Sequence, residues 1–204
     1  MAHVIRQPCD EGVVRSTGAQ SVCTPNAAPW VLAATILGSS MAFIDETALP
    51  VALPAIQSGL DATAVDAQWV VAAYTLFLAA LVLIGGSLGD HLGRRRMFSA
   101  GVVLFALAST WCGLSQSAGQ LILARALQGV GAALLVPNSL AIIGASFEEE
   151  RRGKAIGTWT SLTSVTLILG PLLGGYFAEN VSWRAVFFIN VPIAVAVLVE
   201  LVKA

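Results

Sequence analysis

The chain has 204 residues with a formal net charge of −1; 56% of them are hydrophobic and only 11% are charged. Because a water-soluble domain carries about 25% charged residues, this composition leaves too little polar material for a water-facing surface and favours a protein embedded in lipid. The near-zero charge gives no indication of a nucleic-acid partner, and three cysteines without ligand-like spacing indicate neither a disulfide framework nor a metal site.

Residues 1–29 combine charged residues with serine, threonine, glutamine and proline, and they contain no apolar core segment. A signal peptide needs such a segment, so the pattern instead predicts a short disordered tail in the cytoplasm.

From residue 30 to residue 204 the sequence predicts a bundle of six transmembrane helices. A spanning helix needs roughly 20 mostly apolar residues, and period-2 alternation is absent, which excludes a membrane barrel and leaves an all-α protein. The six runs are about Trp30–Ile56, Trp69–Leu88, Met97–Ala118, Leu121–Phe147, Ala155–Ala178 and Ala185–Val202.

Basic residues outside these runs predict how the bundle is oriented. They lie before the first run, between the second and third, between the fourth and fifth, and after the sixth: Arg6, Arg15, Arg94–Arg96, Arg151, Arg152, Lys154 and Lys203. The alternate connections are mainly acidic. The positive-inside rule therefore predicts a multi-pass protein of the cell membrane with both ends of this chain in the cytoplasm.

Three ionisable residues lie well inside the predicted spans: Asp45 and Glu46 in the first and Arg125 in the fourth. Each costs at least about 2.5–3.5 kcal/mol on insertion scales, so such side chains normally face a cavity and find partners. Asp45 and Arg125 lie at depths that differ by about one helical turn, so they can meet if their helices are neighbours. Asp45 and Glu46 are about 100° apart around a helix, so we expect one of them, Asp45, to face the cavity. Gln128 lies one turn from Arg125 on the same face and could bind the arginine or a substrate.

A carboxylate paired with a guanidinium can couple a proton to a conformational change. The paired carboxylate stays ionised, whereas one without its partner in an apolar cavity takes up a proton. The alternative is a purely structural intramembrane salt bridge. Because buried ion pairs contribute little net stability, we favour the functional interpretation.

The connection between the second and third spans reads Gly86-Ser-Leu-Gly-Asp-His-Leu-Gly-Arg-Arg-Arg96. Glycines at every fourth position from Gly85 permit close helix contact, and the aspartate can pair with basic residues at neighbouring helix ends. The loop resembles the signature loop of the major facilitator superfamily, with His91 where arginine is usual. This resemblance implies a cytoplasmic gating loop formed by Gly86, Asp90, Gly93, Arg94 and Arg95.

The fourth and fifth spans carry two further motifs of that superfamily. The segment Leu121–Gly131 resembles its second motif, in which the buried arginine, here Arg125, is implicated in proton coupling. The segment 157–175 resembles the antiporter signature of exporters, with Thr166 where glycine is usual. Its proline removes an internal hydrogen bond and its glycines leave a groove for a neighbouring helix. The resemblance implies that the interface of the fifth span is shaped by Gly170, Pro171, Gly174 and Gly175; a simple kinked helix is the alternative.

The first span is similar to the Asp-x-Thr…Asn-Val-Ala-Leu-Pro element of the drug:proton antiporter family with fourteen helices, with Pro50 in place of the asparagine. The segment Trp183–Pro192 resembles that family's entry into its sixth helix. These matches imply the six-helix N-terminal bundle of a major facilitator transporter, which exports drugs or other amphipathic small molecules in exchange for protons by alternating access. Asp45 would be the proton or substrate carboxylate, Arg125 its switching partner and Gln128 a polar contact.

Two rivals remain open: an uptake permease of the same superfamily, and a non-transporting membrane scaffold. An enzyme is not expected, because the sequence shows no nucleophile–base set, metal cluster or phosphate loop, and no cofactor is implied. Since the sequence ends just after the sixth span, we expect a fragment whose missing partner is the C-terminal half of the transporter; pairing of two half-molecules is the alternative.

Overall fold

The computed structural model describes residues 28–203, which are helical almost throughout. The predicted disordered tail, residues 1–29, lies almost wholly outside the described residues. The helices are α1 Ala28–Leu60, α2 Ala64–Leu92, α3 Arg94–Leu114, α4 Ala118–Ser146, α5 Glu149–Asn180, α6 Ala185–Phe188 and α7 Asn190–Lys203. Six segments of the described chain are long and apolar enough to cross a membrane, α6 and α7 together forming the last. The all-α, six-span prediction is confirmed.

The helices extend beyond the apolar runs because polar residues cap them. Thr63 precedes α2, and its hydroxyl accepts a hydrogen bond from the backbone N–H of Asp66 at 3.1 Å, while the Asp66 carboxylate accepts from the backbone N–H of Thr63 at 2.9 Å. This reciprocal capping box satisfies two donors at the helix start. Ser117 caps α4 in a similar way by accepting from the N–H of Gln120. Hydropathy alone therefore placed the starts of α2 and α4 about one turn too late.

The sixth predicted span is interrupted at Ile189, which separates α6 from α7. Pro192 stands in the first turn of α7 and has no N–H to donate to the carbonyl of Phe188, four residues earlier. The break places Asn190 at the start of α7, in the middle of the bundle's interior, where it is fully buried.

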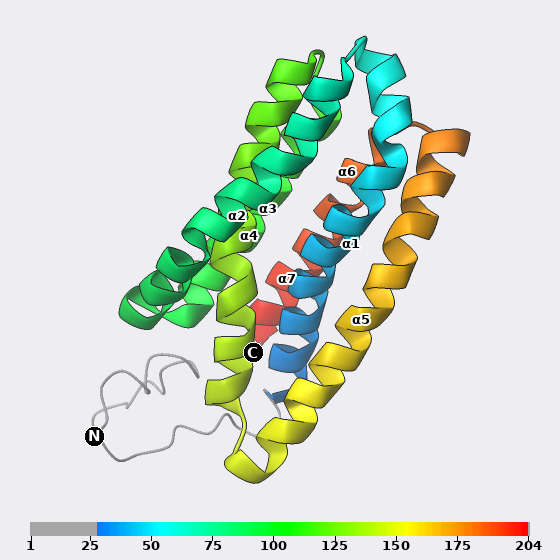
Figure 1. Ribbon diagram of the computed structural model, residues 1–204. Coiled ribbons are helices and arrows are strands. Elements are labelled where there is room, and N and C mark those ends of the chain that lie inside the picture. Colours follow the sequence, from blue (N-terminus) through cyan, green and yellow to red (C-terminus); the bar gives the residue numbers. More distant parts are fainter. Residues whose placement is uncertain (1–27, 204) are drawn as a thin grey trace.

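The helices pack as two groups that meet along α1 and α4 (Figure 1). In one group α2 and α3 pack against α4, and in the other α1 packs against α5 and α7. Glycines permit the close approach in the first group, because a Cβ on Gly85 would collide with the backbone carbonyl of Ala133 on α4. The glycines that recur at every fourth position from Gly85 were expected to permit close contact with a neighbouring helix. In the structure that helix is α4.

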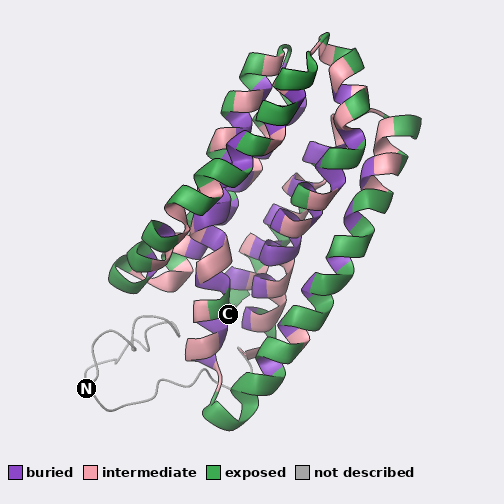
Figure 2. Cartoon of the chain, in the orientation of Figure 1, coloured by how far each residue is buried: buried purple, intermediate pink, exposed green. Residues whose placement is uncertain are grey.

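Burial separates inner from outer helices (Figure 2). Over their most apolar stretch, 56% of the residues of α1 and of α4 are buried, against 22% of those of α2 and of α5. Large apolar side chains remain exposed on the outer helices, for example Leu83, which is 84% exposed, and Ile168, which is 70% exposed. Such an apolar exterior fits a surface that faces lipid or another apolar bundle.

Candidate functional site

The centre of the bundle holds a buried ion pair between α1 and α4. A guanidinium nitrogen of Arg125 donates to one carboxylate oxygen of Asp45. Arg125 is 1% exposed and Asp45 is fully buried. Asp45 and Arg125, whose similar depths in their spans allowed them to meet, are therefore in contact. Two charges at this depth are tolerated only because each neutralises the other and both are hydrogen-bonded.

The carboxylate of Asp45 has two further donors on its other oxygen. The side-chain amide of Gln128 donates to it at 2.8 Å, and that of Asn190 donates to it at 3.2 Å. Gln128 also accepts from Arg125 at 2.7 Å, which closes a three-membered network across α1 and α4. The carboxylate of Asp45 thus accepts three hydrogen bonds, and the one from the charged Arg125 is of the stronger, charge-assisted kind.

Arg125 is also held by α2. Its Nε donates to the backbone carbonyl of Val70 at 3.2 Å, and its guanidinium lies over the ring of Tyr74, 4.3 Å from the ring centroid. On α3, Cys112 makes a weak contact of 3.6 Å from its sulfur to the Gln128 side-chain oxygen. Five helices therefore contribute to the surroundings of one ion pair, so its geometry reports on how those helices are packed.

The site differs from the expected cavity wall in two respects. Asp45 and Gln128 are fully buried among the helices instead of lining an open cavity, and their polar partners lie on α1, α3, α4 and α7. Glu46, by contrast, is exposed; it points about 100° away from Asp45 around the helix. Glu46 therefore stays outside the network of Asp45 and Arg125; of the two candidate carboxylates, Asp45 is the enclosed one, as expected.

Sequence reasoning missed Asn190 as a member of this network. Its amide bridges Asp45 and the hydroxyl of Ser109 on α3, at 2.9 Å from the latter, and its side-chain oxygen is buried without a hydrogen-bond partner among the described residues. An asparagine within two residues of a proline in a membrane span was the available signal, because it is a polar side chain where the helix must break.

The residues of the expected gating loop lie where α2 turns into α3. Gly93 adopts φ 100°, a conformation that side-chain-bearing residues rarely adopt, and the turn depends on it. Arg94 pairs with Asp90 at 2.8 Å and donates to the carbonyl of Ala141 on α4 at 3.0 Å, while Arg95 donates to the carbonyl of Leu201 on α7. Gly86 lies further inside α2, near Pro137 of α4. The loop thus ties α2, α3, α4 and α7 together at one end of the bundle.

The glycines of the fifth span lie against α1. A Cβ on Gly170 would collide with the side chain of Thr47, and one on Gly174 would collide with the backbone of Ala48. Gly175 has looser contact with Val51, and Pro171 is exposed. The groove expected from this motif is therefore filled by α1, the helix that carries Asp45.

These features define a polytopic helical membrane protein with a buried, hydrogen-bonded ion pair between its two most buried helices. Within residues 28–203 no three side chains of the metal-binding types form a group suited to a metal ion. The chain belongs to the Major Facilitator Superfamily, whose sequence profile matches residues 35–203. That family consists of membrane transporters, not enzymes.

Two similar bacterial proteins are named as resistance or export proteins. The tetracenomycin C resistance and export protein of Streptomyces glaucescens is 40% identical over 172 residues, which cover 84% of this chain and 32% of that protein. The methylenomycin A resistance protein of Bacillus subtilis is 36% identical over 188 residues, or 92% of this chain and 40% of that protein. The chain thus spans between 32% and 40% of the length of these two relatives.

Solved structures show the same fold. The crystal structure of a bacterial homologue of the human lysosomal transporter Spinster, in an inward-facing and unoccupied conformation, superposes with a TM-score of 0.75 at 23% identity. The match covers 89% of this chain and 44% of that one. The six described spans correspond to the N-terminal part of such transporters.

Proposed function

We propose that this chain forms the N-terminal bundle of an exporter that moves amphipathic or cationic small molecules outward in exchange for protons. The names of the two relatives, which concern resistance and in one case export, support export as the direction. The helix-5 motif supports it too, because its glycines bring α5 against α1 in the way that the exporter signature implies.

The observation that carries the proposal is the buried pair of Asp45 and Arg125. Asp45 lies on α1 and Arg125 on α4, and their other hydrogen-bond partners lie on α2, α4 and α7. A shift of α1 relative to α4 would therefore separate the two charges. An unpaired carboxylate in an apolar interior is costly, and protonation removes that cost. Asp45 would therefore load a proton in one conformation and release it in the other, where Arg125, Gln128 and Asn190 surround it again.

Burial assigns different roles to the two adjacent carboxylates. Asp45 is enclosed by protein donors, which suits a proton site. Glu46 is exposed on α1, which suits a carboxylate that meets a cationic substrate. The pair would then divide the two tasks that the sequence motif had left to one residue.

The loop at Gly93 and the α1–α5 contact would control the movement. Arg94 and Arg95 reach the carbonyls of α4 and α7 from the start of α3, so their release would free that end of the bundle. Gly170 and Gly174 would let α5 slide along α1 with little side-chain obstruction.

The test uses the full-length protein reconstituted in vesicles with an imposed pH gradient and ethidium as a cationic probe. We expect proton-driven ethidium movement against its gradient, lost in Asp45→Asn with binding retained, whereas Glu46→Gln weakens ethidium binding. The matched control is Glu179→Gln, an exposed carboxylate near the end of α5, which should behave as the unaltered protein. Proton-driven transport that persists in Asp45→Asn would contradict the proposal, and ethidium moving in the same direction as protons would favour an uptake permease.

A further inference from the structure

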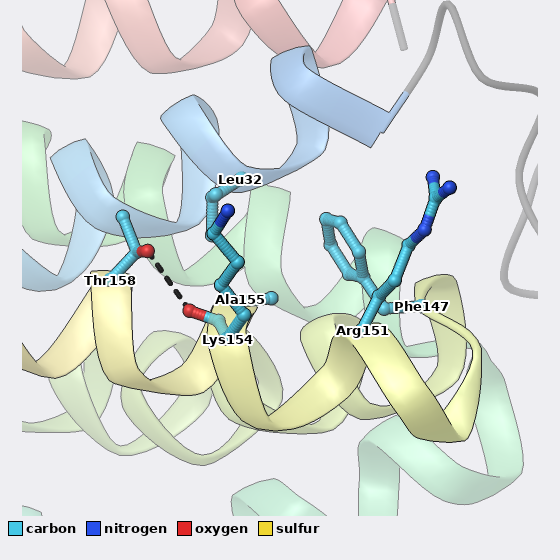
Figure 3. Close-up of a pocket in the computed structure, with 6 residues that line it drawn as sticks. All are labelled: Leu32, Phe147, Arg151, Lys154, Ala155 and Thr158. Carbon is cyan, nitrogen blue, oxygen red and sulfur yellow. Dashed lines mark hydrogen bonds between the residues drawn. The ribbon is translucent and has the colours of Figure 1, made fainter.

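A cavity of about 470 Å³ opens at the end of the bundle where α4 gives way to α5 (Figure 3). Leu32 of α1 and Phe147 of the connection supply its apolar wall. Four residues of the first turns of α5 complete it: Arg151, Lys154, Ala155 and Thr158. The cavity is distant from the buried ion pair and plays no part in the proposed transport cycle.

The two basic side chains face this space. In Figure 3 both rise from α5 toward the start of α1, one on each side of the Phe147 ring. Within residues 28–203 neither Arg151 nor Lys154 forms a salt bridge. The glutamates at positions 148–150 precede them on the chain but do not line the cavity. Two cations without an ionic partner among these residues and one apolar wall therefore meet in one hollow.

Two cations suit an anionic ligand, and the position of the cavity indicates which anionic ligand that is. Leu32 lies in the second turn of α1, and the cavity lies at the helix ends that the loop charges predict to be cytoplasmic. A side chain at that depth meets lipid headgroups on one side and acyl chains on the other. The cytoplasmic leaflet carries anionic lipids, and basic pockets between helices at this level suit their headgroups.

We propose that this cavity binds an anionic phospholipid, with Arg151 and Lys154 holding the phosphodiester oxygens and one acyl chain lying along Leu32 and Phe147. Arginine and lysine both donate charge-assisted hydrogen bonds to phosphate. The bound lipid would join the start of α5 to the start of α1, beyond the contacts that these helices make through Trp159 and through the glycines of α5. The inference does not depend on the proposed proton coupling.

The test measures lipid retention on the purified protein by native mass spectrometry, with dioleoyl phosphatidylglycerol and dioleoyl phosphatidylcholine as probes. We expect phosphatidylglycerol to be retained preferentially. The double variant R151Q/K154Q should lower that retention about tenfold, since each basic residue near a membrane surface contributes to anion binding. The matched control is Arg152→Gln, which removes a neighbouring exposed charge that does not line the cavity.

Two competitors separate the lipid from other sources of phosphate. Inorganic phosphate and glycerol phosphate, which lack acyl chains, should not displace phosphatidylglycerol at millimolar concentration. Displacement by either would show a simple anion site and overturn the lipid proposal. So would equal retention by R151Q/K154Q and the Arg152→Gln control, or equal retention of the two lipids. Thermal unfolding of each variant checks that a lost adduct does not reflect a lost fold.

Discussion

Asn190 on α7 donates its side-chain amide to the carboxylate of Asp45 on α1 at 3.2 Å, across 145 residues of sequence. The contact exists because α7 begins at Asn190, immediately after the break that Pro192 causes. The same amide donates to Ser109 of α3. One side chain thereby connects the ion pair of α1 and α4 to both α7 and α3.

Replacing Asn190 with alanine should destabilise the protein by about 1.5–3 kcal/mol, the usual cost of losing a hydrogen bond to an ionised group. The same substitution at Asn180, an exposed residue whose amide donates only to a carbonyl of its own helix, serves as the control and should have little effect. Unfolding in mixed micelles measures both. Equal stability of the two variants would mean that the Asn190 contact with Asp45 contributes nothing.

The buried pair should behave as one energetic unit. Arg125→Ala leaves Asp45 charged and unpaired, so we expect a loss of about 3–5 kcal/mol. The double variant D45A/R125A removes both charges and should be less destabilised than the sum of the two single variants. Additive losses, measured as unfolding free energies in mixed micelles, would show that the two side chains do not interact.

Adjacent glycines on α2 offer a matched test of helix packing. In Gly85→Ala the new methyl group meets the backbone carbonyl of Ala133, which cannot move aside, so we expect a loss of about 1–3 kcal/mol. In Gly86→Ala the nearest atom is the Pro137 Cβ at 3.7 Å, an ordinary contact. That variant should be neutral or slightly stabilised, because alanine favours helices. We expect Gly85→Ala to unfold at a lower temperature than Gly86→Ala, and the reverse order would contradict the prediction.

The helix-5 motif allows a comparable test of the α1–α5 contact. Gly170→Ala places a methyl group against Thr47 and should push α5 away from α1, lowering both stability and proton-driven transport. Gly157→Ala, on the same helix with nothing within 4 Å of the added carbon, is the control and should retain both. Unchanged transport in Gly170→Ala would show that close contact of α5 with α1 is not needed for function.

The sequence alone predicted the class of protein, six spans and the pairing of Asp45 with Arg125. Those inferences rest on local quantities: apolar run length decides whether a helix can span a membrane, and the scarcity of buried charge leaves few candidate partners. The depth of each residue along its own helix then matched Asp45 to Arg125. The cytoplasmic placement of the chain ends remains a prediction.

Tertiary structure decided which side chains join that pair and which of the two acidic residues is enclosed. Asn190 comes from α7, and Tyr74 and the carbonyl of Val70 come from α2. Their convergence depends on crossing angles and rotations that no single helix encodes. The enclosure of Asp45 and the exposure of Glu46 depend on how α1 is rotated against α4, α5 and α7. The sequence of each helix determines which polar residues it has and at what depth. The close packing of helices around glycines determines which side chains those residues contact.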